Sequence, residues 1–233
     1  MKARYLLPFV LLTAVGCQGG STLALKEEPS YDLVLKLQEG QSFGYTLSKV
    51  GKEENDTAAF DMLYKVQEVT PDSSTVEMTF ERLEMNGADM TPLLKQFAGE
   101  VAMQLKLSNK AETIEHKWTG GNEQFLSMVG NLGGSLLSLP ENPVKVGDKW
   151  SGNIGAMEDG LLVEFELKSV QGNVAQIEAT TKEESTVKLV EPIEIQLDIT
   201  NGMVISQKFV GELGDMGQGT YELKQTQLAS SPQ

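Results

Sequence analysis

The chain has 233 residues, of which 40% are hydrophobic, and it carries a formal net charge of −14 at pH 7. So acidic a chain argues against electrostatic binding to nucleic acid or to anionic lipid headgroups, because both need clustered lysine and arginine. The single histidine and single cysteine exclude an intrachain disulfide and any zinc site built from several His and Cys ligands.

The first seventeen residues have the pattern of an export signal. Lys2 and Arg4 precede the apolar run Leu6–Val15, which leads through a small residue to Cys17. A basic start, a short apolar stretch and small residues at the cut are typical of a secretory signal. The run is too short to span a membrane, which takes about 20 residues. Loss of residues 1–16 removes two basic residues and no acid, so the net charge becomes −16.

The sequence Ala14-Val15-Gly16-Cys17 resembles the lipobox of bacterial lipoproteins. The resemblance implies that the Cys17 thiol is diacylated, that cleavage occurs just before it, and that the new amino group is then acylated. Two or three acyl chains hold a protein stably on a membrane, whereas one does not. Ala14 stands where lipoboxes usually have leucine, which implies less efficient cleavage, and Gln18 lacks the carboxylate that implies inner-membrane retention. The alternative is an ordinary secretory signal with a coincidental cysteine.

The rest of the chain is expected to form one β-rich domain behind a tether. Residues 17–30 are polar and contain glycine, serine and proline, as flexible tethers do. Two β halves, 31–118 and 143–228, are joined by an apolar connector, 119–142, and followed by a short tail, 229–233.

Apolar and polar residues alternate along much of both halves, as they do in strands with one wet face. Leu33–Leu37 and Phe43–Leu47 are expected to form two short strands around a turn. Phe60–Val66 and Val76–Phe80 flank the turn Pro71–Ser74, and this arrangement predicts an antiparallel hairpin.

The same patterns recur in order in the second half. The matches are Tyr64–Val69 with Phe165–Val170, Val76–Thr79 with Ile177–Thr180, and Met103–Asn109 with Ile195–Asn201. Chance similarity between hairpins is the alternative to duplication, but the shared order and shared polar positions favour duplication. One half alone leaves an apolar face uncovered, so the two must close on each other. We therefore predict a mainly β fold, an antiparallel sheet or half-barrel of two pseudo-repeated halves with two short helical insertions.

The two predicted helical insertions are apolar. In the first, residues 90–100, Thr91-Pro92 predicts a helix start because proline fits the first turn. The second lies in the connector 119–142, where Gly133 and its neighbours weaken a helix. We expect a helix, a glycine hinge and a short apolar tail there.

Five apolar side chains are candidate ligand-binding residues: Phe97, Trp118, Phe125, Met128 and Trp150. A concave β surface beneath two apolar insertions can admit a lipid or acyl chain, and methionine adapts to varied apolar partners. The alternative is that the insertions only cap the core.

No catalytic residue, metal site or cofactor is predicted. His116 is expected to lie half-buried on one strand face, and Ser-His-Asp catalysis would have to use it. Acid pairs such as Glu53-Glu54 and Glu183-Glu184 split between two faces on a strand and lack the spacing of a calcium loop. Solvated surface charge is the favoured interpretation of these pairs.

The stretch Pro143–Trp150 and the entrance strand from Gly40 resemble uncharacterised bacterial lipoproteins, and that resemblance implies no function. The expected architecture is similar to that of lipoprotein carriers and receptors of the bacterial envelope. The first hypothesis is a lipid-anchored, non-catalytic module that binds an apolar ligand, a lipid or acyl chain, on the outer membrane facing the periplasm. The second is a structural or assembly partner of another envelope protein. Expected partners are the membrane, through the anchor at Cys17, and a lipid or envelope protein, but not nucleic acid.

Overall fold

The computed structural model describes residues 28–53, 55–120, 136–155, 161–181, 188–212 and 217–226. These residues form a mainly β fold, one open antiparallel sheet with one short helix among them. The first-half elements are β1 Ser42–Gly51, β2 Thr57–Val69, β3 Ser73–Met85, β4 Ala88–Asp89, α1 Thr91–Ala98, β5 Ala102–Ser108 and β6 Thr113–Thr119. The others are β7 Lys149–Ile154, β8 Leu161–Gln171, β9 Val174–Thr181, β10 Lys188–Leu189, β11 Ile193–Asp198, β12 Met203–Glu212 and β13 Gln218–Thr226.

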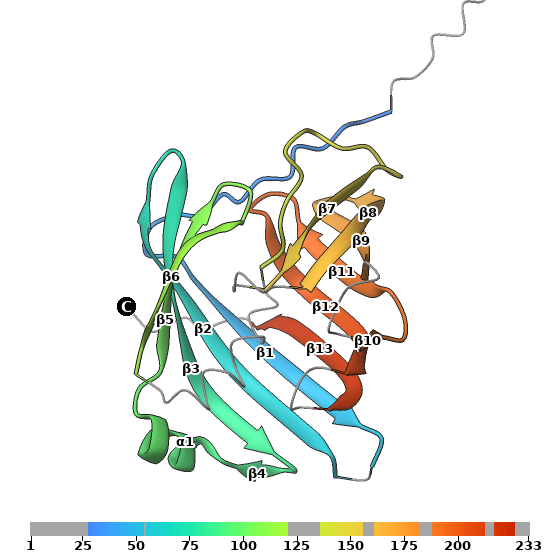
Figure 1. Cartoon of the computed structure of the whole chain (residues 1–233). Helices are drawn as coiled ribbons and strands as arrows, with labels where there is room; N and C mark the ends of the chain where they lie inside the picture. Colours follow the sequence, from blue (N-terminus) through green and yellow to red (C-terminus); the bar gives the residue numbers. More distant parts are fainter. Residues whose placement is uncertain are drawn as a thin grey trace, which may run out of the picture.

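The strands follow the order β6-β5-β3-β2-β1-β13-β12-β11-β9-β8-β7, and short β4 and β10 pair with β3 and β12. The two halves of the chain therefore form the two halves of the sheet, and β13 joins them by pairing with both β1 and β12. Figure 1 shows the sheet curving near β1 and β13, with the strands of the two halves on either side. Strands β6 and β7 are its two edges.

The alternation predicted from the sequence places the core on one face of this sheet. Apolar residues of both halves form a single buried cluster, and Tyr45, Tyr64 and Phe165 are among its largest fully buried side chains. The predicted hairpin on either side of residues 70–72 is confirmed as β2 and β3. We call the face opposite this core the outer face.

The N-terminal segment, residues 31–37, is not the strand that its alternation predicts. The amide of Leu35 donates to the carbonyl of Asn109, and the amide of Lys36 donates to the carbonyl of Asn201. Its leucines are buried nevertheless, with 0% of Leu33 and 8% of Leu37 exposed. The prediction fails because these amides bond to turns at the ends of other strands instead of to a neighbouring strand. In Figure 1 the segment runs across the upper end of the sheet.

The first helical insertion is confirmed as α1, which has proline in its first turn and ends at Gly99 with φ +70°. The second falls largely on residues 121–135, which lie outside the described residues. Its described end, residues 136–139, is extended and not helical, and Leu137 forms an isolated bridge with Ile154. This end is also buried, as expected for a short apolar tail packed against the core.

The proposed repeat can be compared with the strand pairing. Val66 pairs with Val76 in the first hairpin, and Leu167 pairs with Ile177 in the second, at positions that the sequence match makes equivalent. A bulge follows each of these pairs at the equivalent place. Bulges are specific features, so this agreement favours duplication.

The second match agrees less well with the pairing. Gln104 pairs with Lys117 on β6, whereas its match, Gln196, pairs with Ser206 on β12 and not with Lys208. Equivalent strand order is also a property of any antiparallel meander. Duplication of the two halves therefore stays a prediction.

Candidate functional site

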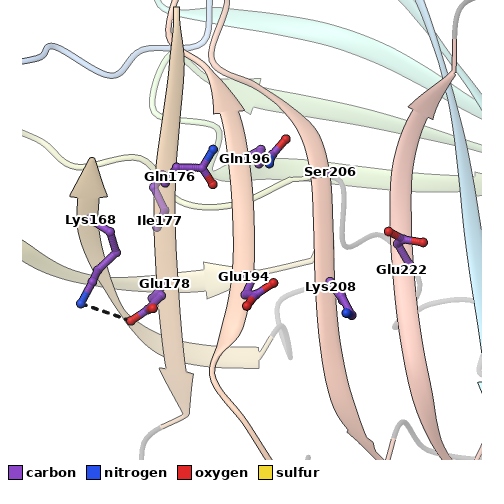
Figure 2. A pocket seen from close by; sticks show the side chains of 9 residues that line it. All are labelled: Lys168, Gln176, Ile177, Glu178, Glu194, Gln196, Ser206, Lys208 and Glu222. Carbon is purple, nitrogen blue, oxygen red and sulfur yellow. Dashed lines mark ion pairs between the residues drawn. The ribbon is translucent and has the colours of Figure 1, made fainter. Parts of the chain in front are cut away.

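A polar groove of about 380 Å³ crosses the outer face of the second half of the sheet. It runs over β8, β9, β11, β12 and β13, and Figure 2 shows its side chains on neighbouring strands. Its lining residues are Lys168, Gln176, Ile177, Glu178, Glu194, Gln196, Ser206, Lys208 and Glu222.

Strand alternation and register bring these side chains together. On β11, buried Ile193, Ile195 and Leu197 face the core, so Glu194 and Gln196 between them face outward. The pairing then aligns two rows across the strands. The first row is Glu166, Glu178, Glu194, Lys208 and Glu222, and the second is Gln176, Gln196, Ser206 and Lys224.

Ion pairs occupy both ends of the first row. At the β13 end, Lys224 Nζ lies 2.9 Å from Glu222 Oε1. Lys168 Nζ lies 2.9 Å from Glu166 Oε1 and 3.3 Å from Glu178 Oε2, the contact dashed in Figure 2. Lys149 Nζ lies 2.9 Å from Glu164 Oε1. The hydrogen bonds that Lys168 donates to Glu166 and then to Glu178 raise the pKa of Lys168, and the bond from Lys168 lowers the pKa of Glu166. Glu166 therefore holds its negative charge and Lys168 its positive charge around neutral pH.

The centre of the groove has no such pairs. Glu194 and Lys208 are opposite each other in register, yet neither forms an ion pair with any described residue. The side chains of Gln176, Gln196 and Ser206 likewise make no hydrogen bond within the described part of the chain. Within the described part of the chain, a carboxylate and an ammonium group without ion pairs thus lie on neighbouring strands with two amides and a hydroxyl.

This arrangement can bind a polar partner, and binding of this kind does not require a catalytic reaction. The carboxylate and amide oxygens accept hydrogen bonds, and the ammonium and amide nitrogens donate them. The groove contains no histidine or cysteine. Among the described residues no group of three or more His, Cys, Asp or Glu side chains is placed to hold a metal ion.

Trp150, one of the five predicted ligand-binding residues, makes one ring-stacking contact and one hydrogen bond. It lies on β7 and stacks on Phe165, with ring centroids 5.3 Å apart. Its Nε1 donates a hydrogen bond of 3.0 Å to the carbonyl of Ser138. These contacts give Trp150 a packing role at this edge of the sheet.

Trp118 lies on β6, at the opposite edge of the sheet, and packs half-buried against the core. Strand pairing therefore does not bring the two tryptophans together. His116 is also half-buried on β6, as expected. Phe97 belongs to α1, but its side chain is outside the description. The other predicted site residues, Cys17, Phe125 and Met128, lie outside the described residues.

Sequence reasoning missed the groove, although part of its signal was visible. The outward positions of β9 and β11 alternate with apolar residues, which identifies a wet face, whereas on β12 Ser206 and Lys208 flank the buried polar Gln207. Which of these polar residues become neighbours depends on the pairing of β9 with β11 and of β11 with β12. The alternation does not determine that register, because shifting one strand by two residues against its neighbour leaves the same side chains facing outward.

Comparison with known proteins assigns no family. No protein family and no curated protein matches the sequence. The fold search found a structure from Bacteroides fragilis NCTC 9343, named as a "putative exported protein with YmcC-like fold". It is 11% identical with a TM-score of 0.32, over 84% of this chain and 99% of that one. At that similarity it assigns neither family nor function. No helix in the described part of the chain is long and apolar enough to cross a membrane.

Proposed function

We propose that this chain is a lipid-anchored, non-catalytic binding module of the bacterial cell envelope, and that its outer groove binds a polar segment of a partner protein. The observation that carries the proposal is the unpaired centre of the groove, where Glu194 and Lys208 face solvent without an ion pair among the described residues. Surface charges of opposite sign normally gain by pairing. A partner segment that offers a base to Glu194 and an acid to Lys208 would pair both.

The location rests on the signal and lipobox in the sequence. Cys17 and Tyr31 are 14 residues apart, a span of at most about 50 Å when fully extended. At Tyr31 the chain is fixed to the fold by two backbone hydrogen bonds with Val144. Acyl chains on Cys17 would therefore keep the sheet within reach of other proteins at the same membrane, which we propose is the outer membrane facing the periplasm.

Intact mass of the protein from its native host tests the anchor. We expect a chain that begins at Cys17 and carries two or three acyl chains. Cys17→Ser should move the protein from the membrane fraction to the soluble fraction. A free thiol, or residues 1–16 still attached, would contradict the anchor.

Site-specific photocrosslinking in cells tests the groove. A photoreactive residue in place of Gln196, at the centre of the groove, should give one dominant crosslinked protein. Gln104 is the matched control, because it is its sequence equivalent on the outer face of β5 and is also exposed. It should give little of this product.

Charge reversal shows whether the captured protein uses the groove. Lys208→Glu combined with the probe at position 196 should reduce the product several-fold, because it leaves the partner's acid opposite another acid. Equal products at positions 104 and 196, or no effect of Lys208→Glu, would rule out the groove as the binding site.

A second candidate function is binding of a lipid or acyl chain at the inner face. The observation in its favour is Trp118, an aromatic side chain on edge strand β6 that packs against the core and is only half-buried. Native mass spectrometry and lipid extraction of protein purified from its own membrane test it. Bound lipid in the wild type that is lost in Trp118→Ala, but kept in Gln104→Ala, supports this function. An interior without lipid in the wild type contradicts it.

A further inference from the structure

Edge strand β6 has one neighbour, β5, among the described strands. Its other edge carries exposed side chains, including Ile114, which is 57% exposed. Glu115 and Lys117 are exposed on the strand, and neither forms an ion pair or hydrogen bond within the described part of the chain. Among the described residues the strand thus presents an edge without a partner strand, together with one acid and one base that form no ion pair.

When two copies of β6 are placed side by side in antiparallel orientation, their charged residues are complementary. In an antiparallel pair centred on His116, Glu115 of each copy lies directly opposite Lys117 of the other. Ile114 then lies opposite Trp118, and His116 lies opposite its own copy. We propose that β6 pairs with β6 of a second copy of this chain, which joins the two sheets into one through a two-fold axis at His116.

Neighbouring registers are less favourable. A pair centred on Lys117 or on Glu115 places two like charges directly opposite each other, which is destabilising. A register shifted by a single residue places the core face of one copy beside the outer face of the other. The register centred on His116 avoids both faults and also covers Ile114, which the bulge in the β5–β6 pairing leaves exposed.

The contact is small, because β6 has seven residues and stable interfaces use roughly 20–30 residues a side. We therefore expect it to form where copies are concentrated, as they are when anchors confine them to one membrane. In this respect alone the inference rests on the proposed function. The pairing geometry itself does not depend on the anchor.

Disulfide crosslinking in cells that express the full chain tests the register. Directly opposed residues of an antiparallel pair have Cα atoms about 4.5–5.5 Å apart, within the disulfide range. His116→Cys should give a covalent dimer at least tenfold more abundant than Glu115→Cys gives, because position 115 faces position 117 of the other copy. Little dimer from His116→Cys, or equal dimer from both variants, would overturn the proposal.

Oxidation of the wild-type chain distinguishes failure of the lipid anchor from failure of the pairing between two β6 strands. An acylated Cys17 cannot form a disulfide, so the wild type should stay monomeric under oxidation. A wild-type dimer would mean that Cys17 is free and would contradict the anchor. The pairing of β6 would then be tested by comparing purified His116→Cys with Glu115→Cys in a Cys17→Ser background at high protein concentration, because no anchor would concentrate the copies.

Charge exchange tests the pairing without relying on a cysteine at the axis. Lys117→Glu places two acids opposite each other in each of the two symmetric pairs and should reduce chemical crosslinking between copies several-fold. Adding Glu115→Lys to it exchanges the charges and should restore the dimer. Thermal melts of each variant check that it is folded. A double variant no better than Lys117→Glu alone would also overturn the proposal.

Discussion

The backbone carbonyls of Asn109 and Asn201 accept hydrogen bonds from successive residues of the N-terminal segment, at 2.8 Å from the Leu35 amide and 2.9 Å from the Lys36 amide. The two asparagines follow β5 and β11, and they are equivalent in the sequence match between the halves. One short segment therefore holds turns from both halves of the sheet.

Gly202→Ala should destabilise the protein by at least about 2 kcal/mol. Gly202 has φ +74°, and a Cβ there would lie 2.4 Å from the carbonyl oxygen of Val34 in the N-terminal segment. The matched control is Gly172→Ala, where φ is +58° but no atom lies within 4 Å of the added Cβ. We expect about 1 kcal/mol there, from backbone strain alone. Urea denaturation measures the free energy of unfolding of both variants. Equal losses of stability would show that the N-terminal segment does not restrict the side chain at position 202.

Leu35→Ala should cost about 2–5 kcal/mol, because it removes a buried side chain from the core. Only 6% of Leu35 is exposed, although the residue lies outside every strand. Val190→Ala is the control, since 63% of Val190 is exposed, and it should change the free energy of unfolding by less than about 0.5 kcal/mol. A loss below about 1 kcal/mol for Leu35→Ala would mean that the segment is not part of the core.

Tyr45→Phe should lower the free energy of unfolding by about 1–3 kcal/mol, because it leaves a buried carbonyl without its donor. The Tyr45 hydroxyl reaches from β1 past β13 and donates to the carbonyl of Val204 on β12, at 2.9 Å. The hydroxyl of Tyr31 makes no hydrogen bond with described residues, so Tyr31→Phe should be nearly neutral. Urea denaturation at neutral pH compares the two variants, and similar effects would contradict a role for the Tyr45 hydrogen bond.

Stability should also fall above pH 10 through Tyr45. Burial first, and then the neighbouring Tyr64, raise the pKa of Tyr45 above its ordinary value of 10.0. A raised pKa in the folded state means that the stabilisation is complete below the pKa of the unfolded chain and is lost as the pH rises past it. The free energy of unfolding should fall more steeply above pH 10 in the wild type than in Tyr45→Phe. Parallel pH profiles would refute this assignment.

The carboxyl of Asp89 should titrate below its ordinary pKa of 3.8, and Thr91→Val should move the value back toward it. Side-chain and then backbone hydrogen bonds from Thr91 lower the pKa of Asp89, and the Thr91 amide donates to Oδ1 at 2.9 Å. The resulting stabilisation is present above the unfolded-state pKa and lost as the pH falls through the folded value. NMR titration of the Asp89 carboxyl checks this. An unchanged value in Thr91→Val would show that Thr91 is not the cause.

Local patterns predicted most of the strands and α1, because the alternation in β2, β3, β8 and β9 and the Thr91-Pro92 start each determine their own element. The N-terminal segment was predicted wrongly for the same reason. Its Leu33, Leu35 and Leu37 have the period of a strand, but what bonds to their amides is set by turns far away in the sequence. Alternation reports which side chains are buried and not what the backbone pairs with.

The candidate site was less predictable than the fold. Glu194 and Lys208 are each ordinary polar positions on an alternating strand, and only the register of β11 with β12 makes them neighbours. Trp118 and Trp150 are large apolar residues that suggested one binding surface, but the strand order places them on opposite edges. Which strands form the two edges follows from topology, which no local pattern contains.

The position of β13 has a consequence for how the chain acquires its structure. β13 follows every other strand in sequence, yet it lies at the middle of the sheet, between β1 and β12. A chain synthesised from its N-terminus therefore cannot join its two sets of strands until residues 218–226 have emerged. Until then β1 and β12 both present open edges, so a chaperone that shields them would act at the step where aggregation is most probable.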